Sequence, residues 1–518
     1  MNRVPLRLAI SALLLLAAPL FAAPASGPKA AAKSDAKAEA KPTSPDSSGA
    51  TPVVTDHSVT VGGKTLRYKV TTGKLPIRND QGETEAEIFF MAYTLERTGG
   101  PETRPLMFSF NGGPGSASVW LHLGAVGPKR VVMMPDGGMP QPPYKLVDND
   151  YTWLDQTDLV FIDPVGTGYS RATKPELGKK FWGVQGDLQS VGEFIRLYLT
   201  RYQRWASPLF LVGESYGTTR AAGLSGYLVE QSGIAFNGIV LVSSILNFET
   251  ADFSRGNELP YSLYLPTYSA IAWYHKKLPA DLQSKPLREV LDESEAFAAN
   301  AYPAALGQGT NLGQAERAAT LDKLTRLTGL DRTYLDRADM RVEIFHFCKE
   351  LLRDQRRTVG RLDGRFKGID ESGVSETPDY DPSLAAIRPP YTATFNQYVR
   401  SELNYKSDLP YYILGGGIGS WDWGSARAGF PDVSGSLREA FAKNPDMKLF
   451  VASGHFDLAT PYFATKYTLD HLGLEPAERA RITTREYEAG HMMYIDTGEL
   501  KKLHTDVSAF ITAALKPR

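Results

Sequence analysis

Short apolar runs alternate with amphipathic segments along much of the chain. Six runs have the length and the apolar or β-branched content of strands, and several are separated by segments with helical spacing. The expected strands are PLMFSF (105–110), DLVFID (158–163), PLFLVG (208–213), GIVLVSS (238–244), KLFVAS (448–453) and RITTREY (481–487). Apolar strands that alternate with helices indicate an α/β fold with a mostly parallel, doubly wound sheet covered on both faces.

This alternation stops between about residues 250 and 410. Three segments in that interval, 287–302, 317–330 and 340–354, have the spacing of amphipathic helices. We therefore expect a mostly helical insertion that forms a lid over the sheet. The whole of residues 56–518 is expected to form one domain that includes this insertion.

The first 55 residues have a different composition. Arg3 and Arg7 precede the apolar run LAISALLLLAAPLFAA and small residues suited to cleavage, which predicts a secretory signal peptide over residues 1–25. Residues 26–55 are rich in Ala, Lys, Ser and Pro and predict a disordered linker. No other stretch approaches the ~20 apolar residues of a membrane span. We expect an exported protein, periplasmic or secreted, with no membrane span after signal cleavage.

Charge and cysteine content exclude several classes of function. The chain has 57 basic and 58 acidic residues, which gives no electrostatic reason to expect nucleic acid as a partner. Its single cysteine, Cys348, has no intramolecular disulfide partner, and its helical spacing predicts a core position. The sequence has no His-Glu-x-x-His and no paired Cys-x-x-Cys, so we expect no metal site. The oligomeric state is not determined by these features.

The first candidate for chemistry is the stretch FLVGESYG, which contains Gly-x-Ser-x-Gly around Ser215. This motif alone is also typical of an ordinary glycine turn at the end of a strand. Here it lies directly between an expected strand and a helix-compatible segment, where a sharp elbow would expose the serine hydroxyl. Gly213 and Gly217 leave room for such a turn. We interpret Ser215 as a nucleophile.

A second glycine-rich stretch, FNGGPGSAS, follows the expected strand 105–110. In α/β folds with a serine elbow, an oxyanion hole is formed by two backbone N–H donors. One comes from the loop after a strand in this position and the other from the residue after the nucleophile. Gly113 and Tyr216 are the candidate donors. A phosphate-binding loop is the competing interpretation, but no Gly-Lys-Ser/Thr sequence follows.

A serine nucleophile needs a base and a carboxylate that orients the base, in the chain order Ser, acid, His. Asp457 comes just after the expected strand 448–453, and His491 comes just after the expected strand 481–487. Both therefore stand at carboxyl ends of strands, where ligands bind in open α/β sheets. None of the other seven histidines follows a strand in this order, and a structural role is the better interpretation for them.

Taken together, NGGPGSAS, IDPVGTGYS, GESYG, the Asp457 turn and GHM occur in an order that resembles the serine carboxypeptidases of the α/β-hydrolase fold. The resemblance covers about residues 55–518. It implies an enzyme that releases C-terminal residues from peptides through an acyl-enzyme, with no metal or organic cofactor. It also implies that Asn111, Gly112 and Glu214 bind the carboxylate of a substrate with a free C-terminus.

The chain departs from that family pattern around the carboxylate-binding positions. Ser109 replaces a tryptophan, Ser116 replaces a cysteine, Ala125 replaces a second carboxylate, and GHMMY lacks the usual proline. A serine esterase, amidase or acyltransferase that uses the same triad is therefore the alternative function. A hydrolase-fold binding protein without activity is a third hypothesis, which the presence of all three triad residues disfavours.

Overall fold

The computed structural model describes residues 51–97, 103–424 and 429–516. The expected signal peptide and most of the expected linker lie outside this part of the chain. The linker was expected to extend to residue 55, but strand β1 begins at Val53. Within the described ranges, every helix is too short or too polar to cross a lipid bilayer.

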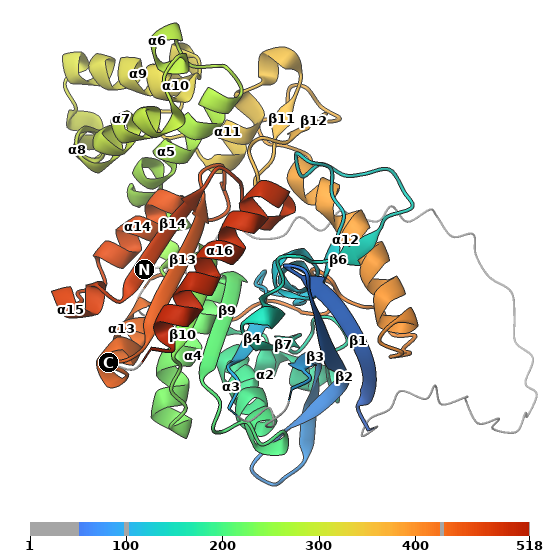
Figure 1. Cartoon of the computed structure of the whole chain (residues 1–518). Coiled ribbons are helices and arrows are strands. Elements are labelled where there is room, and N and C mark those ends of the chain that lie inside the picture. The colour runs from blue at the N-terminus through green and yellow to red at the C-terminus, as the bar shows by residue number, and fades with distance from the viewer. Residues whose placement is uncertain (1–50, 98–102, 425–428, 517–518) are drawn as a thin grey trace, which may run out of the picture. The chain divides into compact units, whose positions relative to one another are not determined.

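One large sheet forms the centre of residues 51–516 (Figure 1). The six strands expected from the sequence are present, and neighbouring strands among them pair in parallel. The strand order is β1 (Val53–Val61), β2 (Lys64–Arg78), β3 (Thr84–Leu95), β7 (Asp158–Ile162), β4 (Leu106–Phe110), β9 (Leu209–Ser215), β10 (Gly238–Ser244), β13 (Lys448–Gly454) and β14 (Ile482–Tyr487). This mostly parallel sheet with helices on both faces is an α/β-hydrolase fold.

The first three strands were not singled out in the sequence, and they are antiparallel. Strands β1 and β2 are joined by Gly62 and Gly63, both with positive φ, as a two-residue hairpin requires. The short strand β8 (Arg171–Ala172) pairs with β3. Two small separate sheets are formed by β5 (Lys129–Val131) with β6 (Leu146–Asp148), and by β11 (Thr358–Val359) with β12 (Lys367–Gly368).

Helices cover both faces of the sheet because alternate side chains of each parallel strand point to opposite faces. In β9, Phe210 and Val212 belong to one hydrophobic cluster, whereas Leu209 and Leu211 belong to the other. Helices α3 (Val184–Arg201), α4 (Tyr216–Ser232) and α13 (Ser434–Lys443) pack into the second cluster, and α12 (Pro382–Ser401) and α16 (Thr497–Ala514) pack into the first. The apolar strands therefore lie fully inside the molecule.

Between β10 and β13 the chain is mostly helical and forms a hydrophobic cluster of its own. This cluster also contains Phe456 and Leu458, which flank Asp457. The helices of this segment before α12 are α5 (Leu259–Tyr274), α6 (Ala280–Gln283), α7 (Leu287–Ala299), α8 (Ala301–Gln308), α9 (Gln314–Thr328), α10 (Arg332–Arg337) and α11 (Ile344–Glu350). Figure 1 shows them gathered at one end of the sheet. Their action as a lid stays a prediction.

Short helices complete the described chain. They are α1 (Val119–Leu121), α2 (Gly178–Phe181), α14 (Tyr462–Asp470), α15 (Pro476–Arg479), the π-helix η1 (His122–Val126), and the 3₁₀ turns η2 (Trp153–Asp155), η3 (Pro175–Leu177), η4 (Phe248–Ala251), η5 (Gly309–Asn311), η6 (Arg353–Gln355) and η7 (Met493–Ile495).

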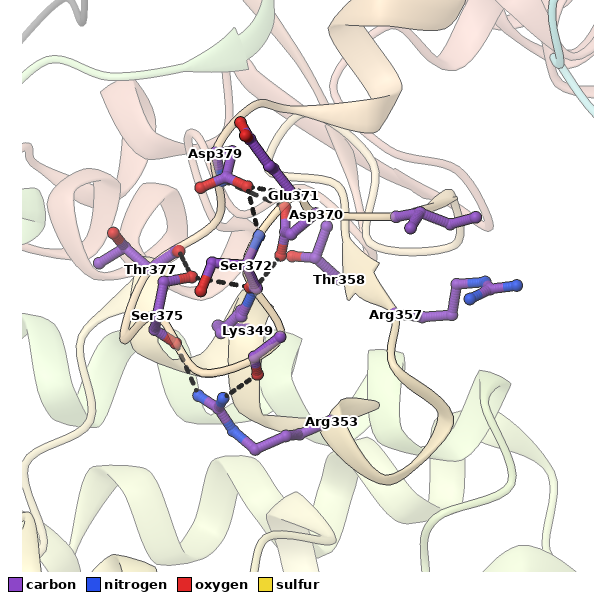
Figure 2. A network of polar contacts seen from close by, with 12 residues as sticks. Lys349, Arg353, Arg357, Thr358, Asp370, Glu371, Ser372, Ser375, Thr377 and Asp379 are labelled. Carbon is purple, nitrogen blue, oxygen red and sulfur yellow. Dashed lines mark hydrogen bonds and ion pairs between the residues drawn. The ribbon is translucent and has the colours of Figure 1, made fainter.

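A long loop between β12 and α12 is tied to α11 and η6 by cationic side chains (Figure 2). The Lys349 ammonium forms a buried ion pair with Asp370 and donates to the Ser372 carbonyl at 2.7 Å. Arg353 donates to the Gly373 carbonyl at 2.8 Å. Arg353 therefore holds a neighbouring loop in place.

Limited proteolysis is expected to cut first within residues 364–383, before any strand of the sheet. Inside this segment Ile369 and Val374 are 63% and 89% exposed, and exposed loop backbone is the least protected against proteases. Mass spectrometry of early fragments measures the order of cleavage. First cuts near Ser215 or Asp457 would contradict the expectation.

Candidate active site

Ser215 lies in a sharp turn between the end of β9 and the start of α4. Its backbone has φ 60° and ψ −130°, a conformation that non-glycine residues rarely adopt. A Cβ atom on Gly213 would lie 2.1 Å from the Gly217 carbonyl oxygen, and one on Gly217 would lie 2.9 Å from the Phe110 carbonyl oxygen. Only glycine fits on either side, so this is the strand-to-helix elbow that the sequence pattern predicts.

The loop after β4 packs closely against this elbow. A Cβ atom on Gly112 would lie only 2.4 Å from the Tyr216 nitrogen and 2.7 Å from the Gly217 nitrogen. The two candidate oxyanion donors, Gly113 and Tyr216, therefore belong to adjoining backbone segments. Tyr216 is also the first residue of the 17-residue helix α4, where unpaired N–H groups and the helix dipole favour a negative charge.

An arginine of α4 anchors the same loop. Arg220 Nη1 donates to the Asn111 carbonyl at 2.6 Å, and Arg220 Nε forms a fully buried ion pair with Asp187 at 2.8 Å. The Asn111 side-chain oxygen accepts from the Leu121 nitrogen at 3.0 Å. Charge-assisted bonds of this kind are strong when buried, so they fix the loop relative to the helix that begins the elbow.

Asp457 and His491 form a buried pair. Asp457 Oδ2 lies 2.8 Å from His491 Nδ1, and Asp457 is fully buried. Asp457 Oδ1 accepts from the backbone N–H groups of Ala459 and Thr460 at 2.8 and 3.1 Å, and the Thr460 hydroxyl donates to Oδ2 at 2.7 Å. These donors hold the carboxylate in one orientation, and the carboxylate in turn fixes the imidazole.

The protonation of His491 is set by two opposing effects. Burial disfavours the charged imidazolium, but the charge and hydrogen bond of Asp457 together with the charge of Glu214 outweigh burial, so the pKa of His491 lies above its ordinary value. A histidine oriented through Nδ1 by a buried carboxylate presents Nε2 as the atom that can accept a proton.

Backbone contacts from two other segments position the same pair. The His491 nitrogen donates to the Leu362 carbonyl at 2.7 Å, and the Leu458 nitrogen donates to the Arg361 carbonyl at 3.0 Å. The Ser243 hydroxyl, at the end of β10, donates to the His491 carbonyl at 2.7 Å. The segment between β10 and β13 therefore contacts both the turn that carries the acid and the turn that carries the base.

Glu214, which precedes Ser215, is a buried carboxyl group beside this pair. Burial raises the pKa of Glu214 to about 7, although the positive field of His491 and hydrogen bonding from Tyr494 and Asn111 act in the opposite direction. The Tyr494 hydroxyl donates to Glu214 Oε2 at 2.5 Å. A carboxyl with such a pKa can be protonated in weakly acidic solution and can then donate a hydrogen bond.

The structure thus brings together the expected acid and base, and it places the expected nucleophile, oxyanion loop and Glu214 at the neighbouring strand ends. Sequence reasoning missed four residues that support them, because their partners are distant in sequence or their types are unremarkable. These are Thr460, Ser243, Tyr494 and Arg220. Only Thr460 is close in sequence to its partner, because it lies in the turn whose backbone N–H groups donate to the Asp457 side chain.

Curated relatives match parts of the chain. It is similar to serine carboxypeptidase-like 13 of Arabidopsis thaliana, with 26% identity over 205 residues that cover 38% of this chain and 44% of that protein. It is 34% identical over 158 residues to a pheromone-processing carboxypeptidase of Saccharomyces cerevisiae, covering 28% of this chain and 20% of that protein. The matched stretch therefore spans less than half the length of either relative.

Among solved structures, the chain is similar to that of a prohormone-processing carboxypeptidase from Saccharomyces cerevisiae. The TM-score is 0.49 and the identity is 17%, over 85% of this chain and 91% of the other. The serine carboxypeptidase family model matches residues 63–327, which is more than half of the 518 residues. The chain therefore belongs to the serine carboxypeptidase family.

Proposed function

We propose that this protein is a serine-type carboxypeptidase that releases C-terminal residues from peptides with a free C-terminus. The observation that carries the proposal is the buried Asp457–His491 pair, 2.8 Å apart, beside a strained elbow that bears Ser215. The charge of His491 acts to lower the pKa of Glu214, which directly precedes Ser215, so the elbow lies close to the pair. Membership of the family supports the same reaction class.

The proposed mechanism uses only groups of this chain. His491 takes the proton of Ser215 as the serine oxygen attacks the scissile carbonyl, and the Gly113 and Tyr216 N–H groups stabilise the oxyanion. His491 then gives that proton to the leaving amine, and the C–N bond breaks to leave an acyl-enzyme. Water, deprotonated by His491, attacks the ester, and the proton returns to Ser215 as the acid product departs.

The proposed exopeptidase specificity comes from Glu214, Asn111 and Gly112. Two carboxyl groups at hydrogen-bond distance cannot both be ionised at low cost, so Glu214 must hold a proton when the substrate carboxylate binds. The elevated pKa of Glu214 favours that state. The Asn111 side chain lies beside Glu214 and offers a second polar contact.

We also propose that the protein is exported, on the basis of the signal-peptide pattern in residues 1–25.

For a free-acid peptide, kcat/KM is expected to fall on both sides of an optimum. Protonation of His491 removes the base as the pH falls through its raised pKa, and ionisation of Glu214 repels the substrate as the pH rises through about 7. The alkaline loss should lie mainly in KM, because Glu214 acts on binding. Glu214→Gln keeps a donor that does not titrate and should flatten this KM dependence. Steady-state kinetics across pH measure both limbs.

A matched amide and a simple ester are the control substrates, since neither has a carboxylate and neither should show the alkaline limb. A time course of peptide digestion read by mass spectrometry identifies the end from which residues leave. Equal turnover of the acid and the amide at acidic pH would contradict the carboxylate-binding role and favour an esterase or amidase.

A further inference from the structure

The Tyr494 hydroxyl donates a hydrogen bond to Glu214 Oε2 at 2.5 Å. Tyr494 lies in η7, three residues after His491, and both its side chain and that of Glu214 are buried. No local pattern in the sequence suggested a function for it. Its partner stands 280 residues earlier in the chain.

The tyrosine ring is held in a fixed position by its surroundings. A Cβ atom on Gly124 of η1 would lie 2.3 Å from the Tyr494 ring and 2.7 Å from the Tyr391 hydroxyl. The ring therefore fills the space that a side chain at position 124 would need. The next residue, Ala125, offers no polar group from η1. Tyr494 brings its hydroxyl into this part of the site instead.

The hydroxyl is a permanent donor. Burial, and then the charge of Glu214, hold the pKa of Tyr494 well above its ordinary value, so the phenol keeps its proton across the range in which Glu214 titrates. Glu214 Oε2 already accepts the Tyr494 hydrogen bond at 2.5 Å, which disfavours binding of the carboxyl proton to the same oxygen. The proton of a neutral Glu214 is therefore favoured on the other oxygen, Oε1.

We propose that Tyr494 is a positioning residue that fixes the proton of Glu214 on Oε1, so that the substrate carboxylate meets a donor in a single orientation. This inference rests on the proposed function, and it names the group that prepares Glu214 for a carboxylate ligand. The remaining groups that face Glu214 are the His491 imidazole, the Asp457 carboxylate, the Asn111 amide and the Tyr391 hydroxyl. Asn111 also hydrogen-bonds Glu214, and the contribution of Tyr494 is the bond of 2.5 Å to one defined oxygen, Oε2.

Removal of the hydroxyl should have two measurable effects. The Tyr494 bond favours the ionised carboxylate, so Tyr494→Phe raises the pKa of Glu214, and the alkaline limb of the peptide KM profile moves to higher pH by about half a unit or more. At acidic pH, KM for a free-acid peptide should rise about threefold to tenfold, because the Glu214 proton is no longer confined to one oxygen. The kcat/KM for a simple ester should change less than about twofold.

Tyr391→Phe is the matched control. It removes the same atom from a buried tyrosine beside Tyr494, and burial, and then the charge of Glu214, raise the pKa of Tyr391 without a direct bond between the two described side chains. This variant should leave the alkaline midpoint in place. An unchanged midpoint in Tyr494→Phe, or an equal loss of ester and peptide turnover, would overturn the proposal.

Infrared difference spectroscopy gives a readout that needs no turnover. The carbonyl stretch of protonated Glu214, assigned by its loss in Glu214→Gln, can be titrated in the substrate-free protein. The titration should shift to higher pH in Tyr494→Phe and stay in place in Tyr391→Phe. If peptides are not cleaved but this shift occurs, the proposed function fails, while the effect of Tyr494 on the protonation of Glu214 stands. If peptides are cleaved and the band does not shift, the Tyr494 proposal fails alone.

Discussion

Replacing Ser215 with Ala, Asp457 with Asn or His491 with Ala is expected to lower kcat by about 10⁴-fold to 10⁶-fold for each substitution. In the proposed mechanism Ser215 supplies the attacking oxygen, His491 is the base, and Asp457 orients the imidazole. Because the three groups act as a unit, the double and triple variants should lose little more than the single ones. Initial rates with a free-acid peptide measure the losses.

Ser225→Ala is a suitable control for the serine variant. Ser225 is a buried serine of the same helix that begins at the elbow, and its hydroxyl donates only to the Ala222 carbonyl, at 2.7 Å. It should retain nearly full activity. Thermal unfolding of all variants should show that the fold is intact. A single triad variant that keeps more than about a tenth of the wild-type kcat would remove that residue from the mechanism.

Gly112→Ala is expected to lower kcat by about 10²-fold to 10³-fold, which is the usual cost of losing one oxyanion donor. The added methyl group would lie 2.4 Å from the Tyr216 nitrogen and 2.8 Å from the Glu214 carbonyl oxygen. Both of these are backbone atoms of the elbow and cannot rotate away. The loop and the elbow must therefore separate, which would displace the proposed oxyanion donors Gly113 and Tyr216 from each other.

The control is Gly435→Ala, in the first turn of α13, where an added Cβ would meet no atom within 4 Å. That variant should be active and as stable as the wild type, because alanine favours helix more than glycine does. Comparing kcat with the midpoint of thermal unfolding separates a displaced oxyanion loop from a general loss of stability. Wild-type kcat in Gly112→Ala would show that the loop does not supply an oxyanion donor.

The parallel strands and the elbow could be read from the sequence because their determinants are local. A strand buried on both faces is apolar at nearly every position, as LFLVG in β9 is, and this pattern does not depend on which strands lie beside it. The turn at Ser215 needs glycine at positions 213 and 217 for steric reasons that arise within a few residues and the adjacent strand. Asp457 and His491 were found by their places after strands, because the carboxyl ends of parallel strands meet at one edge.

The antiparallel strands at the start of the domain were less visible. Strand β1 is mostly exposed or half-buried along its length, so it lacks the continuous apolar pattern of the central strands. The Gly62–Gly63 pair was a usable hairpin signal, since both residues adopt positive φ in the turn. The domain starts at Val53, inside the expected linker, because this residue pairs with β2. Amino-acid composition gives no information about such pairing.

What the sequence alone determined about this protein is its α/β class, its elbow, and the residue types available for the proposed acyl transfer. The tertiary structure decided which groups control the protonation of those residues. Tyr494 reaches Glu214 across 280 positions of the chain, Ser243 reaches His491 across 248, and Arg220 holds Asn111 across 109. A pKa depends on burial and on the charges and donors within a few ångströms, and these are brought together only when distant strand ends assemble at one edge of the sheet.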